Sequence, residues 1–170
     1  MYERKFIYKK GEGVMKFINK KIMMLIMMIC LVLLFPCAAN AANIPNIKYQ
    51  AHISGTGWLS TVGTGKTAGS TGRSARMEAL KIILTSNKKS MIQYRAHVAG
   101  IGWQGWSTSG KIAGTTGQYR AIEAVQIKLT STYEKKYDVY YRVHVAHKGW
   151  LGWTKNGATA GSTGLGLRTE

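Results

Sequence analysis

One pattern is written three times along this chain, with the same residue types at the same offsets from a tryptophan. The three tryptophans lie 45 and 47 residues apart, and each copy opens with the spacing Tyr-x2-His-x5-Trp and continues into glycines and one glutamate. A unit of this length cannot cover its own apolar face, so the copies must shelter one another. The repeated positions are Tyr49, His52, Trp58, Gly72 and Glu78; Tyr94, His97, Trp103, Gly117 and Glu123; and Tyr141, His144, Trp150, Gly164 and Glu170.

Each copy alternates apolar and polar residues in the way typical of β-strands. In residues 94–98 the apolar side chains share one face, while Arg95 and His97 share the other. Residues 123–129 alternate again, and the glycines of 114–117 favour a tight turn between the two strands. We therefore predict an all-β fold of three units about a pseudo-threefold axis, either β-trefoil-like or β-prism-like. The units are approximately residues 47–86, 92–131 and 139–170, and we expect the third to lack its last strand.

Residues 1–41 are predicted to form a helical signal peptide for secretion. Lysines precede an apolar run of 14 residues, 22–35, and small residues follow it with the cleavage motif Ala39-x-Ala41. The run is shorter than the roughly 18 to 20 residues that cross a bilayer, so no membrane span is expected after cleavage. Translation could begin at either Met1 or Met15.

Cleavage would leave residues 42–170 as the mature repeat domain. Both cysteines, Cys30 and Cys37, precede it, which excludes disulfides, cysteine-based zinc sites and thiol catalysis from the domain. Cys37 would matter only if the chain were a lipoprotein, and Pro36 fits that alternative badly. The domain carries 17 Lys and Arg against 5 acids, a net charge of +12, which favours acidic partners.

The repeated residues resemble those of a known family. The opening Tyr-x2-His-x5-Gly-Trp, the turn Ala-Gly-[Ser/Thr]-Thr-Gly and the close Glu-Ala-x-x-Ile-x-Leu are similar to the clostridial hydrophobic repeat with a conserved tryptophan, called the ChW repeat. The resemblance covers residues 47–170 and implies an extracellular binding or attachment role. The chain departs from the pattern at Thr61, where the other copies have a second tryptophan, and at Ala121, where they have an arginine.

The tryptophans fall into two sets with different expected roles. The first tryptophan of each copy follows a glycine, and we expect it to pack into the core, because an indole buries a large area in a small β-domain. The second tryptophan lies in the predicted hairpin tip, where an exposed ring can stack on a sugar or anchor a partner. The candidate ligand-binding residues are Trp106, Trp153, Arg95 and Arg142.

The repeated histidines and glutamates are expected to be structural. Three histidines at an axis could bind zinc, but a bond from each ring to a nearby backbone carbonyl is the interpretation we favour, so no metal site or other cofactor is predicted. The glutamates share the parity of the apolar residues that follow them, and we expect them to join the glycine turn to the closing strand through turn amides or a nearby arginine. Hydrolysis of a glycoside needs two unlike carboxylates at a set distance, which five acids with three in one repeated position do not supply. No enzymatic activity is predicted.

These observations favour a secreted, non-catalytic binding module at the cell surface or in the extracellular space. Several weak, similar sites would together recognise a glycan or an anionic wall polymer. The first alternative is an adhesive module that binds a surface protein. The second is non-specific binding of nucleic acid, which the basic charge and the aromatic residues would suit but which export disfavours.

Overall fold

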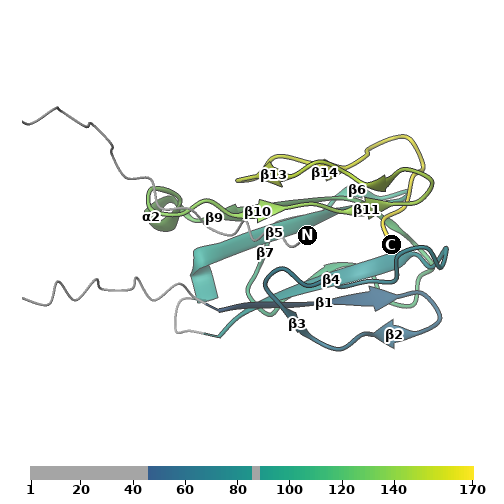
Figure 1. Cartoon of the computed structure of the whole chain (residues 1–170), viewed down its shortest axis with the longest axis horizontal. Helices are drawn as coiled ribbons and strands as arrows, with labels where there is room; N and C mark the ends of the chain where they lie inside the picture. The colour runs from purple at the N-terminus through teal and green to yellow at the C-terminus, as the bar shows by residue number, and fades with distance from the viewer. Residues whose placement is uncertain (1–45, 86–88) are drawn as a thin grey trace, which may run out of the picture. The chain divides into compact units, whose positions relative to one another are not determined.

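The computed structural model describes residues 46–85 and 89–170. The predicted signal peptide at 1–41 lies outside the described residues. Within them almost all regular structure is β-strand, which confirms the predicted all-β class (Figure 1). Over these same residues the structure contains no helix of the length and apolarity that a bilayer crossing requires.

The first copy is built on a long antiparallel pair. Strand β1 (Ile47–Ile53) pairs with β4 (Met77–Leu84) along its whole length. Two short strands, β2 (Gly57–Trp58) and β3 (Val62–Gly63), pair with the other edge of β1. The closing strand β4 thus covers one edge of β1 and the Trp-bearing hairpin covers the other.

The second copy repeats this plan after a short 3-10 turn, η1 (Lys89–Met91). Its opening strand β5 pairs with the closing strand β9, and the short strands β6 and β7 pair with the other edge of β5. The burial of β5 alternates strictly, with Tyr94 buried and Arg95 and His97 partly exposed, as the sequence pattern predicts. These strands are β5 (Ile92–Val98), β6 (Gly102–Trp103), β7 (Ser107–Thr108) and β9 (Ile122–Leu129).

The third copy is less regular and follows a one-turn helix, α2 (Ser131–Glu134). The segment that corresponds to β1 and β5 is divided into two short strands, each paired with part of the hairpin. Glu170 corresponds to Glu78, the second residue of β4. The short strands are β10 (Tyr140–Tyr141) with β13 (Thr154–Lys155), and β11 (His144–Val145) with β12 (Gly149–Trp150).

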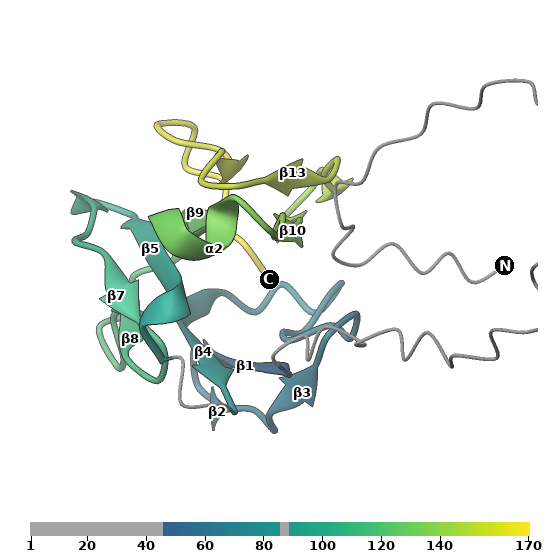
Figure 2. The ribbon, with the colours of Figure 1, turned by 90° about the vertical axis from the view of Figure 1, so that its left-hand side faces the viewer.

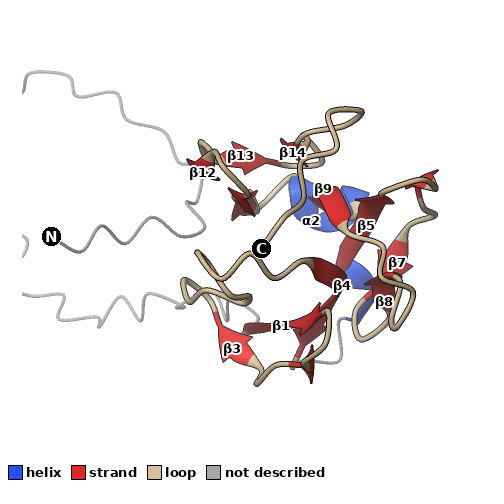
Figure 3. Ribbon diagram, turned by 90° about the vertical axis from the view of Figure 1, so that its right-hand side faces the viewer, coloured by secondary structure: helices blue, strands red, loops and turns tan. Residues whose placement is uncertain are grey.

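Neighbouring copies share strands. Strand β8 (Ile112–Gly114) of the second copy pairs with β4 of the first, and β14 (Ala160–Gly161) of the third copy pairs with β9 of the second. The third copy returns to the first, because the Met77 N–H donates to the Thr169 carbonyl at 3.0 Å. Viewed roughly end-on, strands of all three copies surround the C-terminal end of the chain (Figures 2 and 3).

The core lies between these strands and takes residues from every copy. Tyr94, Ala96 and Val98 of β5 are fully buried, and Ile122 at the start of β9 is equally enclosed. Because one inner face comes from each copy, burial of the apolar side chains depends on the copies staying together. Other members are Ala51, Ile53, Leu80, Ile82, Val125, Ile127, Val143 and Val145.

Candidate functional site

The first tryptophan of each copy lies on the outer face of its sheet. Trp103 stands opposite His97 in the pairing of β5 with β6, and residues directly opposite each other share one face of a sheet. The two ring centroids are 5.3 Å apart in an edge-to-face arrangement. The pairs His52–Trp58 and His144–Trp150 repeat this contact, with centroids 5.3 Å and 5.5 Å apart.

The predicted core role of these tryptophans is therefore wrong. Trp58 and Trp103 are half-buried, and the side chain of Trp150 is 43% exposed. The hairpin register sets the outcome, since it places each indole opposite a histidine that points away from the core. The preceding glycines, such as Gly57 and Gly102, serve the hairpin, where their φ angles are 91° and 90°.

In the second copy an arginine is stacked between the two tryptophans. The Arg95 guanidinium carbon lies 4.9 Å from the Trp103 ring centroid and 4.6 Å from that of Trp106. Lys128 adds a second cation, with Nζ 4.1 Å from the Trp106 ring. Gln126 fixes the stack, because its side-chain oxygen accepts a hydrogen bond from Arg95 Nε at 2.8 Å. We call this arrangement of Trp, Arg and Trp the aromatic ladder.

The third copy carries the more open aromatic ladder. Arg142 lies 4.8 Å from the Trp150 ring and 4.7 Å from the Trp153 ring. The two indoles are 43% and 52% exposed. Cations over indole faces attract the ring electrons, and planar guanidinium groups also bind carboxylate and phosphate. All four predicted ligand-binding residues therefore lie in the two ladders.

The first copy has no such ladder. Gln50 takes the place of the arginine and Thr61 that of the second tryptophan, and the Thr61 hydroxyl donates to the Gln50 side-chain oxygen at 2.7 Å. Among the described residues, Lys81 lies over the Trp58 ring, with its Nζ 4.6 Å from the ring centroid. The outer faces of the three copies therefore offer two aromatic ladders and one polar site.

Each repeated histidine faces a glutamate of its own copy. The Nδ1 to Oε2 distances are 3.3 Å for His52–Glu78, 3.0 Å for His97–Glu123 and 3.2 Å for His144–Glu170. The two atoms are close, but they are not aligned as in a hydrogen bond. We expected each histidine ring to bond to a nearby backbone carbonyl, and the glutamate beside Nδ1 corrects that prediction. A His-x25-Glu spacing in all three copies was the signal that sequence reasoning missed.

The three glutamates are buried, and those of the first and third copies reach across to the next copy. Glu78 is 1% exposed and lies where the register of β1 and β4 shifts by one residue. Its Oε2 accepts the Gly117 N–H of the second copy at 3.1 Å, and Oε2 of Glu170 accepts the Gly72 N–H of the first copy at 3.3 Å. A turn amide was the expected partner, but the turn belongs to the neighbouring copy.

The arginines expected beside the glutamates behave differently from copy to copy. Arg168 Nη2 lies 3.5 Å from Glu170 Oε1, at the long end of a hydrogen bond. Arg76 instead donates to the Tyr119 carbonyl of the second copy at 2.6 Å. Arg120 donates to the Ala99 carbonyl at 3.1 Å. The arginines therefore mainly hold loops together.

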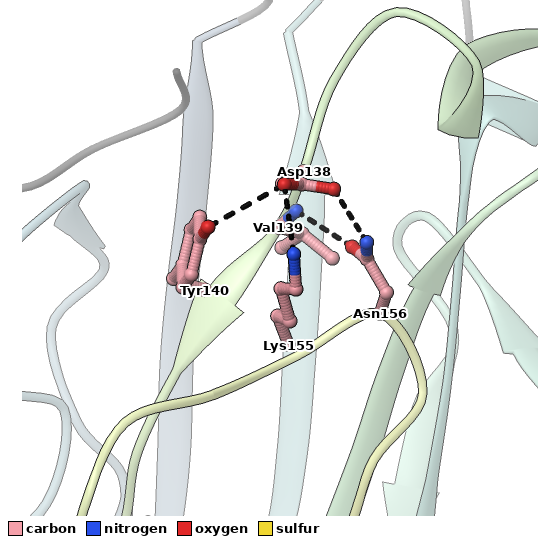
Figure 4. A network of polar contacts seen from close by, with 5 residues as sticks. All are labelled: Asp138, Val139, Tyr140, Lys155 and Asn156. Atoms are coloured by element: carbon pink, nitrogen blue, oxygen red, sulfur yellow. Dashed lines mark hydrogen bonds and ion pairs between the residues drawn. The ribbon is translucent and has the colours of Figure 1, made fainter. Parts of the chain in front are cut away.

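A separate polar network holds the edge of the third copy (Figure 4). Asp138 Oδ1 accepts from Asn156 Nδ2 at 2.6 Å, and Oδ2 accepts from Lys155 Nζ at 3.2 Å. The Asn156 hydrogen bond, together with Lys155, holds the pKa of Asp138 below its ordinary value. Because Asn156 Oδ1 also accepts the Val139 N–H at 3.0 Å, the network fixes the pairing of β10 with β13.

Three separate stretches match the family model described as Clostridial hydrophobic W, at residues 52–86, 97–131 and 144–170. Together they make up more than half of the chain. This protein belongs to the ChW family. The third ChW match is the shortest of the three and ends at Glu170. No curated protein and no solved structure matches the chain. Over the described residues, no three His, Cys, Asp or Glu side chains lie close enough to hold a metal ion.

Proposed function

We propose that this ChW protein is a secreted, non-catalytic module that binds an anionic glycan or wall polymer at the cell surface. The aromatic ladders carry the proposal. An indole face can stack on a sugar ring, while the adjacent guanidinium can pair with a carboxylate or phosphate of the same polymer. Arg142, Trp150 and Trp153 offer both chemistries side by side on an exposed surface.

The proposed arrangement of the copies is pseudo-threefold and prism-like. Two observations support it: closing strands are shared between consecutive copies, and the glutamates of the first and third copies bind the glycine turn of the copy that follows. Such an arrangement presents the outer faces in different directions around one axis. A long polymer with repeated charges could then contact more than one face, and linked weak contacts raise the overall affinity.

The positive charge of the domain supports an anionic ligand. Residues 42–170 carry a net charge of +12, so they attract polyanions from solution. Screening limits this attraction to about 8 Å at physiological ionic strength. Binding of an anionic polymer should therefore weaken as salt is added, whereas a neutral glycan bound through stacking alone should be much less sensitive.

The test is binding of the protein to wall teichoic acid, a polyanion whose units are joined by phosphodiester bonds, and to a neutral glucan of similar length. Trp153→Ala should weaken teichoic acid binding by roughly tenfold, in line with about 1–2 kcal/mol for a partly desolvated cation–π and stacking site. Tyr119→Ala is the matched control, because Tyr119 is 70% exposed and lies outside the ladders. Equal losses in the two variants, or no binding by the unaltered protein, would contradict the proposal.

A further inference from the structure

The three seams between copies are not closed in the same way. At the first seam β4 pairs both with β1 of its own copy and with β8 of the next. At the second, β9 pairs both with β5 and with β14. A closing strand therefore fills each of these seams and supplies apolar side chains to the core.

The third seam lies between the third copy and the first. The Glu170 carbonyl enters this seam in the same way as the carbonyls of Glu78 and Glu123 enter the first and second seams. A Cβ on Gly69 would lie 2.7 Å from the Glu170 carbonyl oxygen, just as one on Gly114 or Gly161 would lie 2.3 Å from that of Glu78 or Glu123. The backbone at Glu170 therefore reaches the third seam at the point where β4 and β9 begin at the other two seams.

A groove of about 300 Å³ continues from this point along the third seam. Its walls come from both copies, Tyr49, Lys66 and Ala68 on one side and Val139, Tyr141 and Val143 on the other. Core residues of the closing strands, including Leu80, Ile82 and Ile127, form its floor. The groove is therefore mainly apolar and follows the course that β4 and β9 take at the other seams.

Matched residues show what a strand does at this place. Ala113 and Ala160, which pair with β4 and β9, are 2% and 4% exposed, but the corresponding Ala68 is only half-buried. Tyr94 is fully buried, whereas Tyr49 is half-buried. The difference lies in the covering strand, because the side chains are identical.

The hydrogen bonds at the filled seams define the register of an occupant. Tyr94 Oη accepts the Ile82 N–H at 3.1 Å, and the Ile82 carbonyl accepts the Gly110 N–H at 2.7 Å. Ile127 is held in the same way, since its carbonyl accepts the Gly157 N–H at 2.8 Å. The corresponding groups at the third seam are Tyr49 Oη and the Gly65 N–H. Among the described residues, neither meets a closing-strand backbone.

We infer that this groove accepts one β-strand from a separate polypeptide, with the apolar alternation of the ChW closing strand. Its second residue would stand between Ala68 and Val143, as Leu80 stands between Ala113 and Ala51. Its fourth would donate its N–H to Tyr49 Oη. Backbone pairing would supply affinity and the alternating apolar side chains would supply specificity. The lining of the groove also includes Arg142, Trp150 and Trp153 of the aromatic ladder in the third copy, but the inference rests on the strand register and not on polymer binding.

The test uses the full chain and a fluorescently labelled peptide with the sequence of residues 124–130, Ala-Val-Gln-Ile-Lys-Leu-Thr. A control peptide, Ala-Gln-Val-Lys-Ile-Leu-Thr, has the same composition. In it Val and Gln are exchanged, and so are Ile and Lys, so that two apolar side chains would face outward. We expect one peptide to bind per chain, with at least tenfold weaker binding of the control peptide. The bound peptide should also raise the melting temperature, because it binds only the folded chain.

Two protein variants locate the peptide. Ala68→Lys should abolish peptide binding by filling the groove, and Ser60→Lys adds the same charge at an exposed position outside it. A melting temperature for Ala68→Lys close to that of Ser60→Lys would show that the variant is folded. Equal binding of the two peptides, or unchanged binding by Ala68→Lys, would overturn the inference. So would dimers that dissociate on Ala68→Lys substitution, because a second copy would then be the occupant.

Discussion

Substitution of Gly114 by alanine tests the sharing of strands between copies. Gly114 is the last residue of β8 and pairs with Ala79 of β4, at the first seam. An added Cβ would lie 2.3 Å from the Glu78 carbonyl oxygen and 2.8 Å from the Ala79 Cα, both of them backbone atoms. These atoms cannot move unless β8 separates from β4.

The expected cost combines two terms. The φ angle of Gly114 is 106°, and a side chain in such backbone costs on the order of 1–3 kcal/mol. Overpacking against the backbone adds roughly 1–3 kcal/mol. Gly114→Ala should therefore lower the free energy of unfolding by about 4 kcal/mol, a large part of the 5–15 kcal/mol typical of a domain.

Gly117→Ala is the matched control. Gly117 has a φ of 68°, and nothing lies within 4 Å of its added Cβ, so only backbone strain of about 1–2 kcal/mol is expected. Urea denaturation followed by tryptophan fluorescence measures both variants. If Gly114→Ala proved no less stable than Gly117→Ala, the close packing of β8 on β4 would be refuted.

Three further predictions concern ionisable groups. Glu78→Ala should cost about 3 kcal/mol, because it leaves His52 and the Gly117 N–H without their buried partner, while Glu134→Ala on the surface should cost less than about 0.5 kcal/mol in the same denaturation assay. Burial raises the pKa of Tyr94 above 10.0, so the neutral phenol stabilises the fold fully below pH 10, and this stabilisation declines at higher pH. The free energy of unfolding, measured by denaturation at pH 9 and 11, should therefore fall less between the two pH values in Tyr94→Phe than in the unaltered protein. Because the pKa of Asp138 is lowered, its carboxylate stabilises the fold above its ordinary pKa of 3.8, and this stabilisation is lost as the solution becomes more acidic. Asp138→Asn should therefore lose less stability than the unaltered protein when the pH falls below about 3.8, and solvent exposure should keep the difference small.

The strands and their inward faces could be predicted because alternation is a local property. Tyr94, Ala96 and Val98 are buried as the pattern indicated. The hydrogen-bond partner of Glu78 was only partly predictable. A turn amide was expected, but nothing local indicates that the turn at Gly117 belongs to the next copy, since that contact depends on how the copies assemble.

The candidate site shows the same limit. Arg95 and Trp106 could be named from their repeat positions, but the third member of the ladder, Trp103, was assigned to the core. Its face follows from the hairpin register, which a count of residues along one strand does not give. The alternation along β5 places His97 on the outer face. Pairing of Trp103 opposite His97 would then have placed the indole on that same face.

The most direct test of the proposed binding site follows the five indole N–H signals of the protein by NMR as wall teichoic acid is added. Binding at the aromatic ladders predicts progressive shifts for Trp150 and Trp153, smaller shifts for Trp103 and Trp106, and a nearly constant signal for Trp58, whose copy has no ladder. Uniform small shifts for all five, or a shift confined to Trp58, would contradict the account.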